Sequence, residues 1–175
     1  MNDMLAEFAQ WIAASEARES ATWLLSNTPG LPPILQTVHL LSIAAVMGSI
    51  IFINLRVLGL AARSQNVGEM IGRLMPWTWV ALLTLFISGL PFILARPARY
   101  FANPVFQIKF SLLIPAILLA VLFYRLSLRH ADYWTSSRQR LIKGKLIAAA
   151  SLLLWLGIVM AGRWIAYSDY LFWPG

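Results

Sequence analysis

His39 is the residue of this chain best suited to chemistry, because it is a single imidazole set within a long apolar stretch. An imidazole can ligate a metal or a haem iron and can carry a proton near neutral pH. Inside a membrane span such a group is costly in lipid, so it indicates a functional site. The second histidine, His130, follows Arg129 in a basic connection, where we expect solvent around it.

Further polar side chains fall at the depth expected for His39. Their types and positions predict a polar pocket that opens outward, and its candidate ligand-binding residues are Gln36, His39, Tyr100, Asn103, Lys109, Met160, Arg163 and Tyr167. Several bases without an acid favour an anionic or electron-rich ligand. The structural alternative, given equal weight, is that Lys109 and Arg163 reach lipid phosphates while His39 bonds a neighbouring helix.

Haem b is the most concrete candidate cofactor, since four-helix membrane bundles often hold it between facing helices. His39 would ligate the iron, Met160 could add a sulfur ligand at a similar depth, and Lys109 or Arg163 could pair with the propionates. A methionine in a span is more often a packing residue, which is the alternative for Met160. A bare metal ion at His39 is less favoured, because we expect no second imidazole and no carboxylate nearby.

The composition is that of a membrane protein. Of the 175 residues, 59% are hydrophobic and 12% are charged, well outside the range of soluble domains. The net charge of +7 sits in the connections between apolar runs, as membrane topology requires, so nucleic acid is not expected as a partner. The lack of cysteine excludes disulfides, iron–sulfur clusters, thiolate metal sites and cysteine nucleophiles.

No carboxylate falls within a predicted span. The seven acids are Asp3, Glu7, Glu16, Glu19, Glu69, Asp132 and Asp169. A proton-driven pump, an intramembrane aspartyl protease and a di-iron enzyme are therefore disfavoured. Nucleophile–base constellations, phosphate-binding loops and glycine fingerprints are also missing from the sequence. A catalytic role is thus less expected than a binding role.

The sequence predicts an all-α polytopic membrane protein in two parts. Residues 1–30 form an amphipathic segment lying in the membrane interface, without the features of a signal peptide. Residues 31–175 form a bundle of four transmembrane helices, with spans at about 33–59, 76–95, 106–128 and 141–167. An α-helix turns by about 100° per residue, so several polar and apolar residues of the first span lie on one narrow face, which we expect to contact protein. Its members are Gln36, His39, Ile43, Met47, Ile50 and Asn54.

The orientation follows from the distribution of basic residues. Of the 14 Lys and Arg residues, nine fall on the side of the first and third connections between spans, and five fall on the opposite side. This excess favours a cytoplasmic location for those connections and an external location for both termini. In a bacterial inner membrane, both termini and the mouth of the pocket would then be periplasmic.

Six segments carry a family resemblance. PILQTVHLL, NLRVLGL, LMPWTWV, SGLPFIL, YFANPVFQIKF and LLLWLGIVMAGRWIAY resemble the successive motifs of an uncharacterised family of bacterial four-helix inner-membrane proteins, a domain of unknown function. The resemblance spans residues 33–167 and implies recurring polar positions at His39, Arg56, Tyr100, Asn103, Lys109 and Arg163. It also implies that an acid is more usual where this chain has Gln36 and Asn54. A more distant likeness to haem- or copper-handling four-helix membrane proteins is one of architecture, which carries no function.

These observations lead to three hypotheses of function. The first is a membrane protein that binds a small ligand or cofactor, with haem b serving electron transfer. The second is a small-anion carrier in which Arg96, Lys109 and Arg163 attract the solute, although the inner half of the bundle is poor in polar groups. The third is a non-catalytic accessory subunit whose polar stripe meets a membrane-protein partner or a second copy. The lipid bilayer is the partner expected in each case.

Overall fold

The computed structural model describes residues 2–129 and 137–167, and within them every regular element is helical. The elements are α1 (Asn2–Ala13), α2 (Glu16–Asn27), α3 (Leu31–Leu58), α4 (Val67–Ala95), α5 (Pro97–Phe101), α6 (Pro104–Arg129), α7 (Arg138–Trp164) and the 3-10 turn η1 (Ile165–Tyr167). The all-α prediction is confirmed. His130, expected to be solvated, lies outside the described residues.

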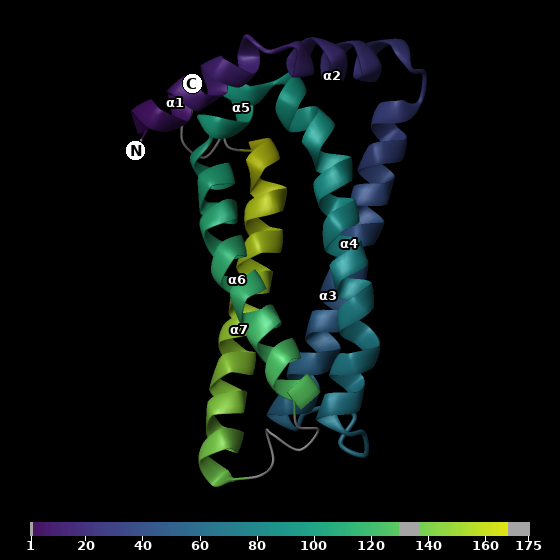
Figure 1. The fold of residues 1–175 in the computed structure, drawn as a ribbon, viewed down its shortest axis with the longest axis vertical. Helices are drawn as coiled ribbons and strands as arrows, with labels where there is room; N and C mark the ends of the chain where they lie inside the picture. Colours follow the sequence, from purple (N-terminus) through teal and green to yellow (C-terminus); the bar gives the residue numbers. More distant parts are fainter. Residues whose placement is uncertain (1, 130–136, 168–175) are drawn as a thin grey trace.

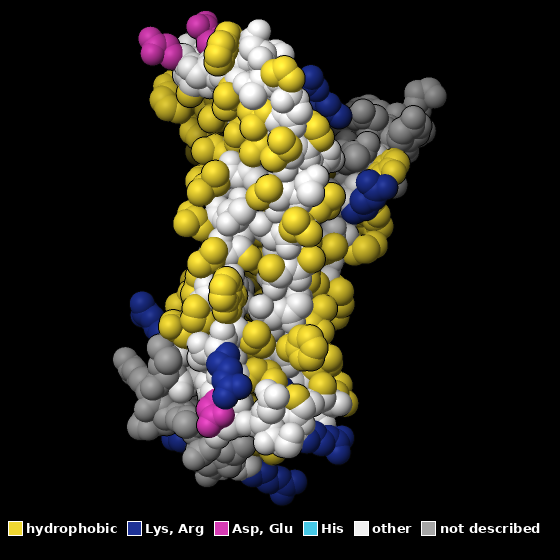
Figure 2. Space-filling view, turned by 90° about the vertical axis from the view of Figure 1, so that its right-hand side faces the viewer, with side chains coloured by type: hydrophobic (Ala, Val, Ile, Leu, Met, Phe, Trp, Pro, Cys, Tyr) yellow, Lys and Arg dark blue, Asp and Glu magenta, His cyan; other side chains and the backbone are white. Residues whose placement is uncertain are grey.

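Four of these helices, α3, α4, α6 and α7, are long and apolar enough to cross a membrane. Figure 2 shows hydrophobic side chains spread over one face of the molecule between its two ends. Large apolar residues on this surface, such as Leu153 at 71% exposure and Trp77 at 70%, require an apolar surrounding. The chain is therefore a multi-pass membrane protein in a lipid environment, as predicted.

The spanning helices form two antiparallel pairs, α3 with α4 and α6 with α7, joined by contacts of α3 with α7 and of α4 with α6. The short helices α1 and α2 lie across one end of this bundle, where α1 contacts α5 and α2 contacts α4 (Figure 1). We call this the capped end and the opposite end, with the α3–α4 connection, the loop end. A position across helix ends is the one that an interfacial helix takes.

Helix α3, which carries His39, is delimited by two glycines. Gly30 (φ 78°) precedes it and Gly59 (φ 79°) follows it, and a side chain at either position would be strained in this left-handed conformation. Pro32 and Pro33 occupy its first turn, where no intrahelical N–H is required. These signals set the length of α3 at 28 residues.

Helix α4 begins nearer the loop end than the span predicted from about residue 76. Asn66 caps it, with Oδ1 accepting from the backbone N–H groups of Gly68 (2.7 Å) and Glu69 (3.4 Å). Pro76, where the predicted span began, instead lies exposed within the helix. Spanning helices tolerate internal prolines because neighbouring groups and local adjustments satisfy the freed carbonyl.

The buried apolar core occupies the loop-end half of the bundle. Its residues come from all four spans and are Val46, Ile50, Ile53, Val57, Val67, Met70, Ile71, Met75, Ala81, Ala116, Ala120, Phe123, Ala148, Trp155 and Ile158. Within the described chain, no buried member of this core precedes Val46 on α3 or Ala116 on α6. His39 therefore lies outside this core, in the half of the bundle near the capped end.

Candidate ligand-binding site

His39 on α3 is held by Ser88 on α4. The imidazole Nδ1 lies 2.9 Å from Ser88 Oγ, and the Ser88 hydroxyl donates to the Thr84 carbonyl at 2.7 Å. A hydroxyl has one proton, so when Ser88 donates to the Thr84 carbonyl, its Oγ accepts from His39 Nδ1–H. This assignment places the free electron pair of the neutral imidazole on Nε2, the atom that can ligate a metal or accept a proton.

Gly89 gives the imidazole its place against α4. A Cβ at residue 89 would lie 3.2 Å from Cε1 of His39 and 3.6 Å from its Nδ1. The first of these distances is too tight without movement of the ring, so the glycine allows His39 to approach Ser88. The serine and glycine together form a polar notch on α4, and this notch fixes the orientation of the imidazole.

Lys109 on α6 faces the same region from the other helix pair. It lies within electrostatic reach of His39, and its Nζ is 3.8 Å from the position that a Cβ would take at Gly162 on α7. Its side chain is half-buried. His39, Ser88, Lys109 and Gly162 thus bring one residue from each spanning helix to one level of the bundle.

No described carboxylate on the spanning helices neutralises Lys109. Among the described residues, Glu69 is the one acid on a spanning helix, and it lies in the first turn of α4, near the loop end. There its carboxylate is 3.9 Å from Arg73. A half-buried ammonium with no such counter-ion favours a negatively charged ligand, since an unpaired charge in a low dielectric is costly.

The contact between α3 and α7 sets the depth of Arg163. Asn54 Nδ2 donates to Ser151 Oγ at 3.2 Å, which fixes the register of these antiparallel helices. At about 1.5 Å per residue, His39 lies ~22 Å above Asn54 and Arg163 lies ~18 Å above Ser151. The predicted match in depth therefore follows from the register. Arg163 itself is exposed.

Arg163 and Tyr167 form a local pair at the end of α7. The Arg163 guanidinium donates to Tyr167 Oη at 2.9 Å, and its Cζ lies 5.0 Å from the centre of the tyrosine ring. The pair holds the guanidinium near the capped end. Because Arg163 is exposed there, an anionic group can approach its guanidinium.

Two other predicted site residues organise the capped end. Asn103 Oδ1 accepts from Val105 N (2.9 Å) and Phe106 N (3.4 Å) at the start of α6. Its Nδ2 donates to the Ile165 carbonyl beyond α7 at 3.5 Å. Tyr100 is half-buried, and its ring centre lies 5.4 Å from that of Phe106. These contacts give both residues a positioning role.

Gln36 and Met160, the two remaining residues predicted to bind the ligand, are exposed on their helices. Gln36 is exposed on α3, and Met160 is 50% exposed on α7. An exposed thioether is not enclosed by the bundle, so this position does not favour Met160 as a sulfur ligand opposite His39. Among the described residues, no three His, Cys, Asp or Glu side chains gather into a group that could hold a metal ion.

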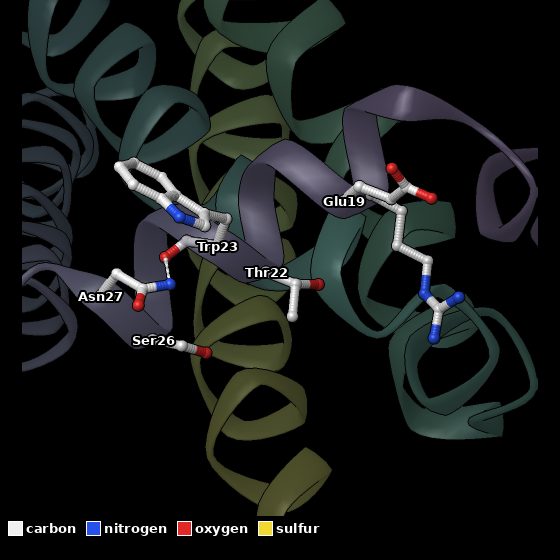
Figure 3. Close-up of a pocket in the computed structure, with 6 residues that line it drawn as sticks. Glu19, Thr22, Trp23, Ser26 and Asn27 are labelled. Atoms are coloured by element: carbon white, nitrogen blue, oxygen red, sulfur yellow. Dashed lines mark hydrogen bonds between the residues drawn. The ribbon is translucent and has the colours of Figure 1, made fainter.

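Two surface depressions lie along α2. One is lined by Glu19, Ser20, Trp23 and Leu24, and the other, drawn in Figure 3, by Arg18, Glu19, Thr22, Trp23, Ser26 and Asn27. In the close-up, Asn27 Nδ2 donates to the Trp23 carbonyl of the same helix at 3.0 Å. None of the residues predicted to bind the ligand lines either depression. With Trp23 65% exposed, these depressions belong to the outer surface of the protein.

Sequence reasoning missed the partners of two polar residues. Ser88 bonds both its own helix, at the Thr84 carbonyl, and the neighbouring helix, at His39. Its position beside Gly89 was the available signal for a close approach. Ser151, the partner of Asn54, is one small polar residue in an apolar run and gave no comparable signal.

A comparison with protein-family models matches residues 31–168 to a family of unknown function (DUF6644). The match covers all four spanning helices and confirms the expected relation to an uncharacterised family. No curated protein and no solved structure matches the chain. The comparisons therefore supply no activity.

Proposed function

Since the chain belongs to this family of unknown function, we propose its role from its own side chains: it is a membrane-embedded binding protein for a small ligand or cofactor. The ligand presents an electron-pair acceptor to His39 and negative charge to Lys109. The observation that carries the proposal is the His39–Ser88 bond, because it directs the electron pair of the imidazole to Nε2 while Lys109 lies in electrostatic reach.

Haem b has both properties and is the cofactor we propose first. Its iron accepts an imidazole nitrogen, its macrocycle supplies four of the iron ligands, and its propionates carry negative charge. His39 would ligate the iron, and Lys109 with the exposed Arg163 would pair with the propionates. When bound, the haem supplies one-electron chemistry, so the protein would serve electron transfer.

The location of the site follows from the excess of bases near the loop end. We propose that the loop end is cytoplasmic and that the protein lies in a bacterial inner membrane with both termini in the periplasm. The ligand then reaches His39 from the periplasmic half of the bilayer. The apolar core in the loop-end half separates this site from the cytoplasm.

Haem titration tests the proposed cofactor. We expect the detergent-purified protein, titrated with haem b, to develop a Soret band that saturates at about one haem per chain, because one oriented imidazole is present. The reduced and oxidised spectra should interconvert reversibly. A titration that leaves the spectrum of free haem unchanged would rule out the haem proposal.

A small-anion carrier is the second candidate, because Lys109 has no described carboxylate partner on the spanning helices. The packed core weighs against it, since conduction requires a continuous polar route. Proteoliposomes loaded with chloride or phosphate separate the two functions. Flux that depends on Lys109 and not on His39 would favour the carrier over the haem protein.

Ser88 offers a test of how the imidazole is oriented. Replacing Ser88 with alanine removes the acceptor for His39 Nδ1–H, and loss of such an outer partner typically weakens binding by about 10- to 100-fold. We expect haem affinity to fall in this range when it is measured at a temperature at which the variant is folded. Ser111→Ala is the matched control, because Ser111 is exposed and bonds only its own helix, at the Ile108 carbonyl. Equal affinities of the two variants would contradict the role of Ser88.

A further inference from the structure

A second polar group of side chains lies inside the apolar core, between α3 and α7. Asn54, Ser151 and Trp155 are each 3% exposed. The Asn54 amide donates to Ser151 Oγ at 3.2 Å. Trp155 Nε1 is buried and has no hydrogen-bond partner among the described residues. A buried N–H without an acceptor is costly, so this indole needs an explanation.

The helix directions bring the indole toward the Asn54–Ser151 pair. Side chains of an α-helix lean toward its N-terminus and cover the preceding turn. Trp155 lies one turn after Ser151, so it leans back over Ser151. Asn54 leans toward the capped end on antiparallel α3, which is toward the level of Trp155. The three polar groups therefore converge from the two helices.

These groups retain complementary hydrogen-bonding capacity. The Trp155 indole offers one donor, and the Asn54 carbonyl offers an acceptor because its bond to Ser151 uses the amide nitrogen. The Ser151 hydroxyl keeps its proton. One molecule that both accepts and donates can satisfy all three groups, and a buried water typically makes about three such bonds.

We propose that one buried water molecule occupies the α3–α7 interface, accepting from Trp155 Nε1–H and donating to Asn54 Oδ1. Ile50, one turn before Asn54, and Ile158, one turn after Trp155, belong to the apolar core, so the site is separate from bulk solvent. The water would couple α3 to α7, and thus join the two helix pairs, independently of the ligand proposed for His39.

Indole NMR tests this directly. In the ¹⁵N-tryptophan-labelled protein in deuterated detergent, we expect the Trp155 indole N–H to show a cross-peak to water. Trp155→Phe assigns the signal, and Trp77→Phe, at a 70% exposed position, is the control. An assigned Trp155 signal without a water cross-peak would overturn the proposal. If Trp155→Phe does not fold, Asn54→Leu carries the test: one indole should lose its water cross-peak, and unchanged cross-peaks would overturn the proposal.

Thermal unfolding provides a second readout. If the water is present, Trp155→Phe should lower the thermal midpoint by roughly 2–4 °C, because the water loses its hydrogen bond from the indole N–H. Asn54→Leu should then cost less in the Trp155→Phe background than in the native chain, since the two residues share that water. Additive shifts, or a higher midpoint for Trp155→Phe, would show a dry interface and contradict the proposal.

Discussion

Replacement of His39 by alanine is expected to abolish haem binding to the purified protein, with affinity falling by more than about 100-fold. This loss of affinity is larger than the ~10- to 100-fold loss typical for a residue that only hydrogen-bonds a metal ligand, because His39 would itself ligate the iron. His39→Gln is the sharper variant, since its amide can still donate to Ser88 but offers no imidazole nitrogen. Absorption titrations of both variants, at thermal midpoints close to that of the native chain, measure the effect.

The comparison of these two variants separates ligation from packing. If His39→Gln bound haem as the native protein does, the imidazole would be a helix-contact residue, and the bond to Ser88 at 2.9 Å would be its whole role. Retained Soret bands in both variants would place any haem away from this notch. In either case an anion carrier or an accessory subunit would explain the position of Lys109 better than a haem protein.

The architecture of the bundle was predictable because it depends on chain length and polarity. Each span must be long enough to cross the bilayer and must satisfy its backbone groups internally, which favours helices. The match in depth between His39 and Arg163 also follows from counting residues along antiparallel helices. The start of α4 was less predictable, because a proline such as Pro76 is typical of a first helical turn, whereas the helix is capped earlier, at Asn66.

The sequence could not predict which side chains of a span face the protein interior and which face lipid, and the reason is physical. Lipid is as apolar as a protein core, so residues on the two sides of a spanning helix need not differ in polarity. On α7, Leu153 is 71% exposed whereas Trp155 is 3% exposed, although both are apolar and two positions apart. For the same reason the sequence did not place Met160 on the exterior or pair Ser88 with His39.

The division of the bundle into two halves explains where a ligand could bind. The loop-end half is filled by the buried apolar core, which holds the two helix pairs together. The capped half combines aromatic contacts around Phe106 with polar contacts, such as His39 with Ser88 and Asn103 with the Ile165 carbonyl. A ligand inserted among apolar side chains would disrupt packing, whereas one at the polar level would complete the bonding of His39 and Lys109.

Lys109→Met is the second variant for which we expect a large effect. It keeps the length of the side chain against Gly162 but removes the charge. A hydrogen bond to a charged group contributes about 1.5–3 kcal/mol, so haem affinity should fall by roughly 10- to 100-fold. Lys145→Met, at an exposed position of α7 far from His39 in the chain, is the matched control and should bind haem as the native protein does.

The dimethyl ester of haem b shows whether Lys109 acts through its charge. Esterification neutralises both propionates while leaving the iron and the macrocycle available to His39. We therefore expect Lys109→Met and the native protein to bind the ester with equal affinity, although they differ for haem b itself. If Lys109→Met weakened both ligands equally, Lys109 would contribute through its packing on Gly162, and the ligand would need no negative charge.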